Sequence, residues 1–446
     1  MINKQELELL ADALKILDDG AGELPAFTPP VDKEALAPVL NEVARRMQDN
    51  YPYFHPQYAG QMLKPPHPVA RIAYALSMWV NPNNHALDGG RASSAMEKEC
   101  IVELGRMFGW DGPLGHLTSS GTIANLEGLW VAGKLHPGKR VLASEQAHYT
   151  HGRISDVLGI PYSSLAVDQS GRIDVAALET ELQKGDVGTV VVTIGTTGLG
   201  VVDPLADILA LRDSYDFRIH ADAAYGGYFG LSSLLAERTR ATYDILEAVD
   251  SIVIDPHKHG LQPYGCGCIL FRDPAVGTLY KHGSPYTYFS STELHLGEIS
   301  LECSRAGASA VALWATMRLM PLDPEGELAR GLDASLRAAR DFWQRLDASE
   351  QFVPLMHPEL DIVVYAVSAD DAVESSARAR AVFENAAKRD LHLALADFPS
   401  SLVAVYAPDM AMNAENVTCL RSVLMKPEHE DWIERITALL EASAEG

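Results

Sequence analysis

Thr189-Val-Val-Val-Thr-Ile194, followed by Gly195-Thr-Thr-Gly198, is the stretch that decides the fold. An unbroken run of β-branched residues is typical of a strand that is buried on both faces, as in the middle of a parallel sheet. Around it, we predict helices at residues 175–183 and 205–215 and strands at 141–144, 218–222, 251–254 and 268–271. Strands that alternate with helices predict an α/β fold built on a mostly parallel sheet.

The chain of 446 residues is too long for one compact core, so several domains are expected. Helical patterns occur at residues 32–48, 95–108 and 304–320, and a proline-rich connector occupies 51–68. Beyond residue 320 the pattern predicts a helix at 332–346 and strands at 362–367, 391–394 and 402–406. We therefore expect an N-terminal helical and extended segment (1–64), a large domain (65–320) and a smaller C-terminal domain (321–446).

Charge and cysteine content exclude several classes of protein. The net charge of −24 argues against nucleic acid and anionic membranes as partners, because both require basic patches. Five cysteines are an odd number in a long chain, which favours reduced thiols in a cytoplasmic protein. Residues 1–19 lack the cationic start and apolar block of a signal peptide, and no stretch is apolar enough to span a bilayer.

Two ionisable residues follow predicted strands. Lys258 lies in Asp255-Pro-His-Lys258-His-Gly260, directly after the strand at 251–254. Lysine is seldom buried without a function, and a desolvated amine can act as a nucleophile. Asp222 ends the strand at 218–222, where carboxyl ends of parallel strands face a ligand crevice. A carboxylate there could pair with a pyridinium nitrogen and make that ring an electron sink.

Three further motifs also lie at strand or helix ends. Ser120-Gly121-Thr122 leads into a helix, whose free N–H groups suit an anion such as phosphate. His148 could stack on a flat ring, and Thr197 could donate a hydrogen bond to a ring hydroxyl. Each motif alone also fits an ordinary turn, helix cap or structural histidine. Their order along the chain is what favours a cofactor site.

That order resembles the group II pyridoxal-phosphate-dependent decarboxylases, the family of aromatic amino acid, glutamate, tyrosine and histidine decarboxylases, over residues 53–427. The resemblance implies PLP fold-type I, aspartate aminotransferase-like architecture: a large, mostly parallel seven-stranded sheet plus a smaller C-terminal α/β domain. It also implies pyridoxal 5′-phosphate (PLP) as cofactor and a homodimer whose subunits share the active site.

The resemblance also implies roles for individual residues. Lys258 would carry PLP, and Asp222 would pair with the pyridine nitrogen of PLP. His148 and Ala224 would lie on opposite faces of the ring, with Thr197 near the ring hydroxyl. The phosphate would be bound by Ser120, Gly121, Thr122 and His257. Asp255 stands where the family often has asparagine, which would put an extra carboxylate beside the phosphate.

The substrate site is implied less fully. Residues 81–87, with His85 and Leu87, would reach the site of the neighbouring subunit, while Tyr58 and Arg421 would lie on their own side; Arg421 fits a structural ion pair equally well. Tyr286 and Tyr288 both lie in a loop whose tyrosine would protonate the substrate carbon, with a slight preference for Tyr288.

The expected reaction is decarboxylation of an L-amino acid to its amine. Aromatic residues in the implied pocket favour an aromatic substrate, although Lys64, Arg71 and Arg91 keep acidic substrates open. The alternatives are a PLP-dependent carbon–carbon lyase of the sphingosine-phosphate lyase type, an aminotransferase, and a catalytically inactive binding protein on the same fold. Decarboxylation coupled to oxidative deamination also stays open, because it depends on the loop tyrosine.

Overall fold

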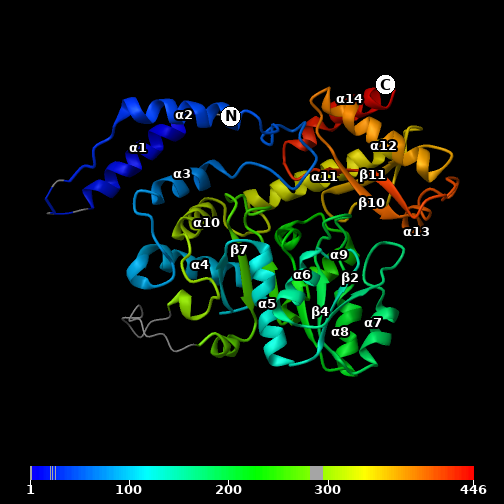
Figure 1. Ribbon diagram of the computed structural model, residues 1–446, viewed down its shortest axis with the longest axis horizontal. Coiled ribbons are helices and arrows are strands. Elements are labelled where there is room, and N and C mark those ends of the chain that lie inside the picture. The colour runs from blue at the N-terminus through cyan, green and yellow to red at the C-terminus, as the bar shows by residue number, and fades with distance from the viewer. Residues whose placement is uncertain (1–2, 21, 23, 26, 282–294, 446) are drawn as a thin grey trace.

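A seven-stranded sheet forms the centre of the large domain (Figure 1). The computed structural model describes residues 3–20, 22, 24–25, 27–281 and 295–445. The strand order is β1-β7-β6-β5-β4-β2-β3, and β7 alone runs antiparallel to its neighbours. The predicted mostly parallel α/β sheet is thereby confirmed. The strands are β1 (Leu114–Thr118), β2 (Arg140–Ser144), β3 (Tyr162–Leu165), β4 (Val187–Thr193), β5 (Arg218–Asp222), β6 (Ser251–Ile254) and β7 (Gly267–Phe271).

The register of the central strands brings their carboxyl ends to one edge of the sheet. All seven residues of β4 are buried, as its β-branched composition predicts. Thr193 at the end of β4 pairs with Asp222 at the end of β5, and Asp222 pairs with Val253 on β6. The helices of this domain are α3 (Pro68–Ser77), α4 (Arg91–Met107), α5 (Gly121–Leu135), α6 (Thr150–Leu158), α7 (Val175–Leu182), α8 (Leu205–Ala210), α9 (Glu237–Tyr243) and α10 (Gly307–Leu319).

A four-stranded antiparallel sheet of order β10-β11-β9-β8 forms the smaller domain, drawn in orange and red in Figure 1. Two of its three helices pack against this sheet and the third packs against those two, around a second core of buried aromatic and aliphatic side chains. The strands are β8 (Phe352–Pro354), β9 (Ile362–Val367), β10 (Ala394–Pro399) and β11 (Asn416–Val423), and the helices are α11 (Glu327–Asp347), α12 (Ala372–Ala387) and α14 (His429–Ala444).

Two predictions for the small domain were wrong. Residues 402–406, expected as a strand, belong to the short helix α13 (Ser400–Val403) and the turn after it. The strand expected at 391–394 begins only at Ala394, where β10 starts. A short apolar run fits a buried strand and a buried helical turn equally well, so periodicity cannot separate the two.

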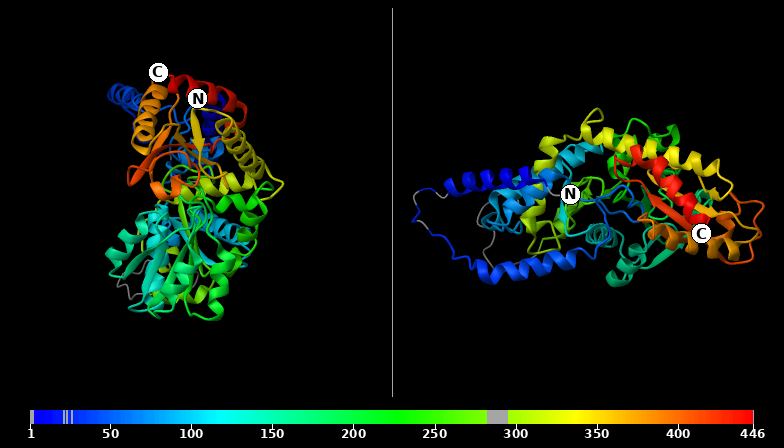
Figure 2. Two further views of the ribbon diagram at one scale, coloured as in Figure 1. Left: turned by 90° about the vertical axis from the view of Figure 1, so that its right-hand side faces the viewer. Right: turned by 90° about the horizontal axis from the view of Figure 1, so that it is seen from above.

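Two N-terminal helices, α1 (Lys4–Asp19) and α2 (Lys33–Met47), lie at the end of the molecule away from the small domain (Figures 1 and 2). α1 contacts α3, yet neither α1 nor α2 has a buried residue. The apolar side chains of α2, at Leu36, Val39, Leu40, Val43 and Met47, are all exposed. Among the described residues, no helix combines the length and apolar character that crossing a membrane requires.

Candidate active site

The carboxyl ends of the central strands surround a cavity of about 200 Å³. Every residue that the sequence predicted for cofactor binding lines it, because parallel strands deliver their carboxyl-end loops to one edge of the sheet. The lining residues are Ser120, Gly121, Thr122, Asn125, His148, Thr150, Thr193, Gly195, Thr197, Asp222, Ala224, Tyr225, Asp255, His257 and Lys258.

Asp222, only 5% exposed, is held in place by three donors. Its Oδ1 accepts the backbone N–H of Ala224 at 3.2 Å, and its Oδ2 accepts His151 Nε2 at 2.9 Å and Asn125 Nδ2 at 3.4 Å. Burial would raise the pKa of Asp222, but the hydrogen bond from His151 and the charge of Lys258 outweigh it and hold that pKa well below its usual value. A carboxylate has about four lone-pair positions. Asp222 is therefore an anion with one acceptor position left for a ring N–H in the cavity.

Lys258 brings an amine to the same cavity. Its Nζ lies 3.1 Å from Asp255 Oδ2, and His257 Nε2 lies 3.5 Å from the same oxygen. Asp255 is 2% exposed, and its second oxygen has no hydrogen-bond partner among the described residues. The Asp255 carboxylate, which is buried at the wall of the cavity, thus balances the charge of Lys258.

The first turn of α5 forms a cradle for an anion. Ser120 caps the helix, since its side chain accepts the Ile123 N–H at 3.3 Å, and the first N–H groups of any helix have no partner within the helix itself. A Cβ at Gly121 would lie 2.5 Å from Asp255 Oδ2, so only glycine fits between the helix and that carboxylate. The extra carboxylate expected from the sequence therefore faces the cradle.

His148 lies just before α6 and is partly buried. Its Nδ1 is 2.8 Å from Thr150 Oγ1, and its ring stacks on Tyr149 with the centroids 4.5 Å apart. Burial lowers the pKa of His148, and the nearby Asp222 offsets part of this change. A neutral imidazole is therefore favoured at this wall of the cavity.

The four residues predicted for the substrate do not line this cavity. Tyr58 packs edge-on against Tyr53, with ring centroids 4.9 Å apart. His85 Nε2 lies 3.7 Å from Cys303 Sγ, and the backbone N–H of Leu87 donates to His295 Nδ1 at 3.2 Å. These three side chains belong to the connector and loops beside the sheet. The two loop tyrosines, Tyr286 and Tyr288, lie outside the described residues.

Arg421, on β11 of the small domain, is buried without a full set of acceptors. Its Nη1 is 3.4 Å from Gln61 Oε1, while its Nε and Nη2 have no hydrogen-bond partner among the described residues. Burial lowers the pKa of Arg421, and the neighbouring Tyr225, Tyr58 and Asp361 partly offset this. Since Tyr225 lines the cofactor cavity, Arg421 is the predicted substrate residue with an electrostatic link to it.

Sequence reasoning missed several lining residues and one buried neighbour. Asn125 lies one helical turn after Gly121, and Thr193 ends β4, so both positions could have been inferred from the strand and helix ends. His151, the second residue of α6 and three residues after His148, contacts Asp222 rather than solvent. The periodicity of α6 was the available signal for it.

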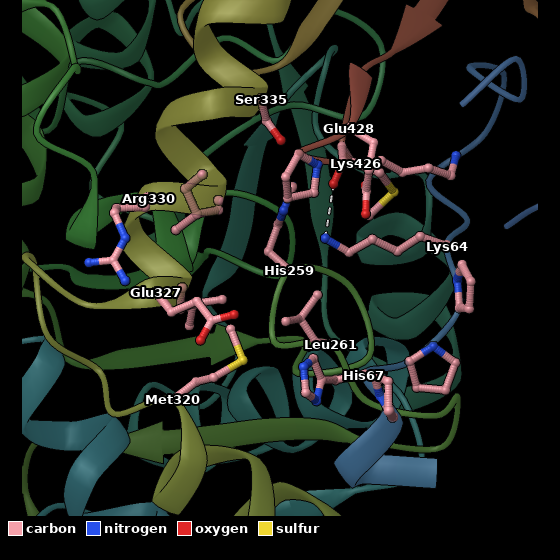
Figure 3. A pocket seen from close by; sticks show the side chains of 18 of the residues that line it. Lys64, His67, His259, Leu261, Met320, Glu327, Arg330, Ser335, Lys426 and Glu428 are labelled. Atoms are coloured by element: carbon pink, nitrogen blue, oxygen red, sulfur yellow. Dashed lines mark hydrogen bonds between the residues drawn. The ribbon is translucent and has the colours of Figure 1, made fainter. Parts of the chain in front are cut away.

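His259, directly after Lys258, faces a different and larger cavity of about 610 Å³ (Figure 3). Lys64 enters this cavity from the N-terminal connector, and its Nζ donates to the Met425 carbonyl at 2.9 Å. His259 Nε2 also lies 3.3 Å from Asp361 Oδ2, and Tyr225 Oη donates to Asp361 Oδ1 at 2.5 Å. Asp361 of the small domain thereby joins the loop after β5 to the loop that carries Lys258.

The residues of the smaller cavity fit PLP. A helix N-terminus with a required glycine suits the phosphate, Asp222 offers one acceptor position to a ring N–H, and Lys258 supplies an amine. No group of three or more His, Cys, Asp or Glu residues arranged to hold a metal ion occurs in the described ranges.

Comparison with known proteins agrees with this geometry. The family model of the pyridoxal-dependent decarboxylase conserved domain matches residues 129–368. The L-tyrosine decarboxylase of Enterococcus faecium is 26% identical over 77% of this chain and 74% of its own length. A probable L-tyrosine/L-aspartate decarboxylase of Methanothermobacter thermautotrophicus is 31% identical over 69% of this chain and 82% of its own.

A solved structure gives the same result for the fold. The structure of Oryza sativa TDC with PLP and tryptamine superposes with a TM-score of 0.77, covering 98% of this chain and 96% of that chain at 16% identity. Such a low identity establishes the fold alone, whereas the family model and the curated relatives establish the chemistry. This protein belongs to the pyridoxal-dependent decarboxylase family and is a PLP-dependent amino acid decarboxylase.

Proposed function

We propose that Lys258 carries PLP and that the protein releases the α-carboxylate of an aromatic L-amino acid as CO₂, leaving the amine. The observation that carries this proposal is the single cavity shared by Lys258, Asp222 and the first turn of α5. When bound, PLP supplies an electron sink that accepts the electron pair left behind by CO₂. The protein supplies binding, orientation and the control of protons.

The proposed roles follow from the side chains present at each wall. Asp222 accepts a hydrogen bond from the pyridine N–H and keeps the proton on that nitrogen. Lys258 would hold the cofactor through its side-chain amine. His148 and Ala224 are proposed to contact the two faces of the ring, and Thr197 the ring hydroxyl. Ser120, Gly121, Thr122 and His257 are proposed to bind the phosphate. Tyr288 is proposed to donate the proton that replaces CO₂.

An aromatic substrate is supported by the relatives named as L-tyrosine decarboxylases and by aromatic rings at the cavity. Tyr225 lines it, and Tyr264 packs on the lining residue His257 with ring centroids 4.9 Å apart. A second candidate, an acidic substrate such as aspartate, is favoured by Arg421, whose unpaired donors suit a carboxylate. Incubation with tyrosine, phenylalanine, aspartate and glutamate separates the two, by measurement of CO₂ and of amine or aldehyde by mass.

We also propose a homodimer with a shared active site, to which His85 and Leu87 contribute across the interface. The exposed apolar stripe of α2 supports this, because monomeric proteins seldom leave such a stripe uncovered. Leu40→Glu is expected to give monomers in light scattering, while Asn41→Glu in the same helix leaves the dimer intact. A dimer that survives Leu40→Glu would contradict this interface.

The five free cysteines support a reducing compartment, the cytoplasm.

Lys258→Ala tests the cofactor role directly. The wild-type protein with PLP is expected to be yellow and to retain the cofactor after borohydride reduction and denaturation. The variant is expected to lose this retained label and its turnover, while the fold stays intact by circular dichroism. Full turnover of Lys258→Ala would refute the proposed role.

A further inference from the structure

Behind Asp222 lies a buried histidine to which the proposed function assigns no role. His151, on α6, has 0% of its surface exposed, and its Nε2 contacts Asp222 Oδ2 at 2.9 Å. This is the shorter of the two side-chain contacts to that oxygen, since Asn125 Nδ2 lies at 3.4 Å. His151 does not line the cofactor cavity, so it acts on the cavity through Asp222.

The position of the proton in this contact follows from the charge of Asp222. Because the pKa of Asp222 lies well below its usual value, the carboxylate is ionised and accepts hydrogen bonds only. His151 Nε2 must therefore carry a proton. His151 Nδ1 has no hydrogen-bond partner among the described residues, so no acceptor of that set draws the proton to the other nitrogen. The tautomer that donates to Asp222 is the one that the surroundings favour.

The other polar groups around this pair are neutral or already engaged. Burial lowers the pKa of His220 to about 3, so it is uncharged, and its ring nitrogens contact Ser251 Oγ at 2.7 Å and Asn125 Oδ1 at 2.8 Å. His148 and Lys258 approach Asp222 from the cavity side. His151 is thus the donor that contacts Asp222 from the side away from the cavity.

We propose that His151 is a positioning residue, which keeps Asp222 ionised and oriented so that its remaining lone pair holds a proton on the pyridine nitrogen of PLP. This inference rests on the proposed placement of the ring against Asp222. A hydrogen bond to one carboxylate oxygen fixes the plane of the carboxylate and leaves the free lone pair aimed into the cavity.

Two matched variants and two cofactors test the proposal. Glutamine at position 151 puts an amide N–H close to the place of Nε2, whereas asparagine is too short to reach Asp222. Dissociation constants of the apoprotein are measured for PLP and for its 1-deaza analogue, in which C–H replaces the ring nitrogen. The ratio of the two constants reports the contribution of the ring nitrogen alone.

In the wild type and in His151→Gln, PLP is expected to bind more tightly than the analogue. The ratio of the two dissociation constants in His151→Gln should agree with the wild-type ratio within about threefold. In His151→Asn, PLP binding is expected to weaken about ten- to a hundred-fold, the range typical of losing a partner that orients a ligating side chain. Binding of the analogue is expected to stay within about twofold of wild type, because the analogue lacks the group on which Asp222 acts.

Equal losses for both cofactors in His151→Asn, or no loss for either, would overturn the role of His151. Equal affinities in the wild type itself would instead overturn the proposed contact between Asp222 and the ring nitrogen. Circular dichroism checks the fold of each variant. If His151→Asn does not fold, His151→Leu is judged by the same ratio.

Discussion

Substitution of Gly121 by alanine is the sharpest test of the phosphate cradle. Gly121 is the first residue of α5 and lines the cofactor cavity. A Cβ at this position would lie 2.5 Å from Asp255 Oδ2 and 2.6 Å from Oδ1, well inside the 3.4 Å at which ordinary contact begins. Asp255 has little freedom to retreat, because it is buried and contacts Lys258 at 3.1 Å. The helix start or the carboxylate has to shift.

Overpacking of this kind typically costs about 1–3 kcal/mol. Since about 1.4 kcal/mol is a factor of ten in affinity, Gly121→Ala should weaken PLP binding roughly 5- to 150-fold if the strain falls on the cradle. The assay is titration of the apoprotein with PLP, followed by absorbance, together with thermal unfolding of the apoprotein. Ser119→Ala, at an exposed neighbouring position, is the control and should bind PLP within about twofold of wild type.

A double-mutant cycle with Asp255→Ala shows whether the overlap is the cause. Shortening Asp255 removes the oxygens that the new methyl group would meet, so Gly121→Ala should cost much less in that background. Unchanged PLP affinity in Gly121→Ala would refute the reasoning. An equal loss with and without the Asp255 carboxylate would also refute it.

Stability should fall with falling pH, because burial lowers the pKa of His220 and of His429 to about 3 each. In the unfolded chain both histidines take up a proton below about pH 6.5, whereas in the folded protein they stay neutral down to about pH 3. The free energy of unfolding should therefore be highest above pH 6.5 and fall by up to about 2.7 kcal/mol per pH unit below it. Urea denaturation at pH 7, 6 and 5 measures this slope, and His429→Gln should reduce it by the share of about one proton. Arg305→Met should lower the free energy of unfolding by about 3–5 kcal/mol, because it leaves the buried Glu97 carboxylate, 2.9 Å from Arg305, without its cation. The exposed Arg345→Met should cost less than about 1 kcal/mol in the same assay, and equal costs would contradict the role of burial.

Five of the seven strands of the large domain could be predicted because they carry a strong local signal, whereas the outer strands β1 and β3 were not predicted. β5 and β6 begin and end at the predicted residues, since each is a short buried run bounded by polar turns. The small domain was harder. β11 was not predicted, because Thr418, Arg421 and Ser422 interrupt its apolar pattern although all three are buried. Burial of these polar residues depends on neighbours distant in the sequence.

The same distinction separates the cofactor residues from the substrate residues. Asp222 and Lys258 could be brought together from the sequence, because parallel strands end at a common edge. The surroundings of Tyr58 and Arg421 depend on how the connector and the small domain pack, which no local pattern encodes. His151 was missed altogether, because no helix was predicted around it and its contact with Asp222 depends on how α6 packs behind β5.

The contact of Asp361 with Tyr225 and His259 has a mechanical consequence. Tyr225 follows the residue proposed for one ring face, and His259 follows the lysine proposed to hold the cofactor, so a single side chain of the small domain contacts the neighbour of each. Loss of these contacts while the Asp361 carboxylate stays buried would cost about 3–5 kcal/mol. The placement of the small domain against the loop that carries Lys258 is therefore fixed in part at Asp361.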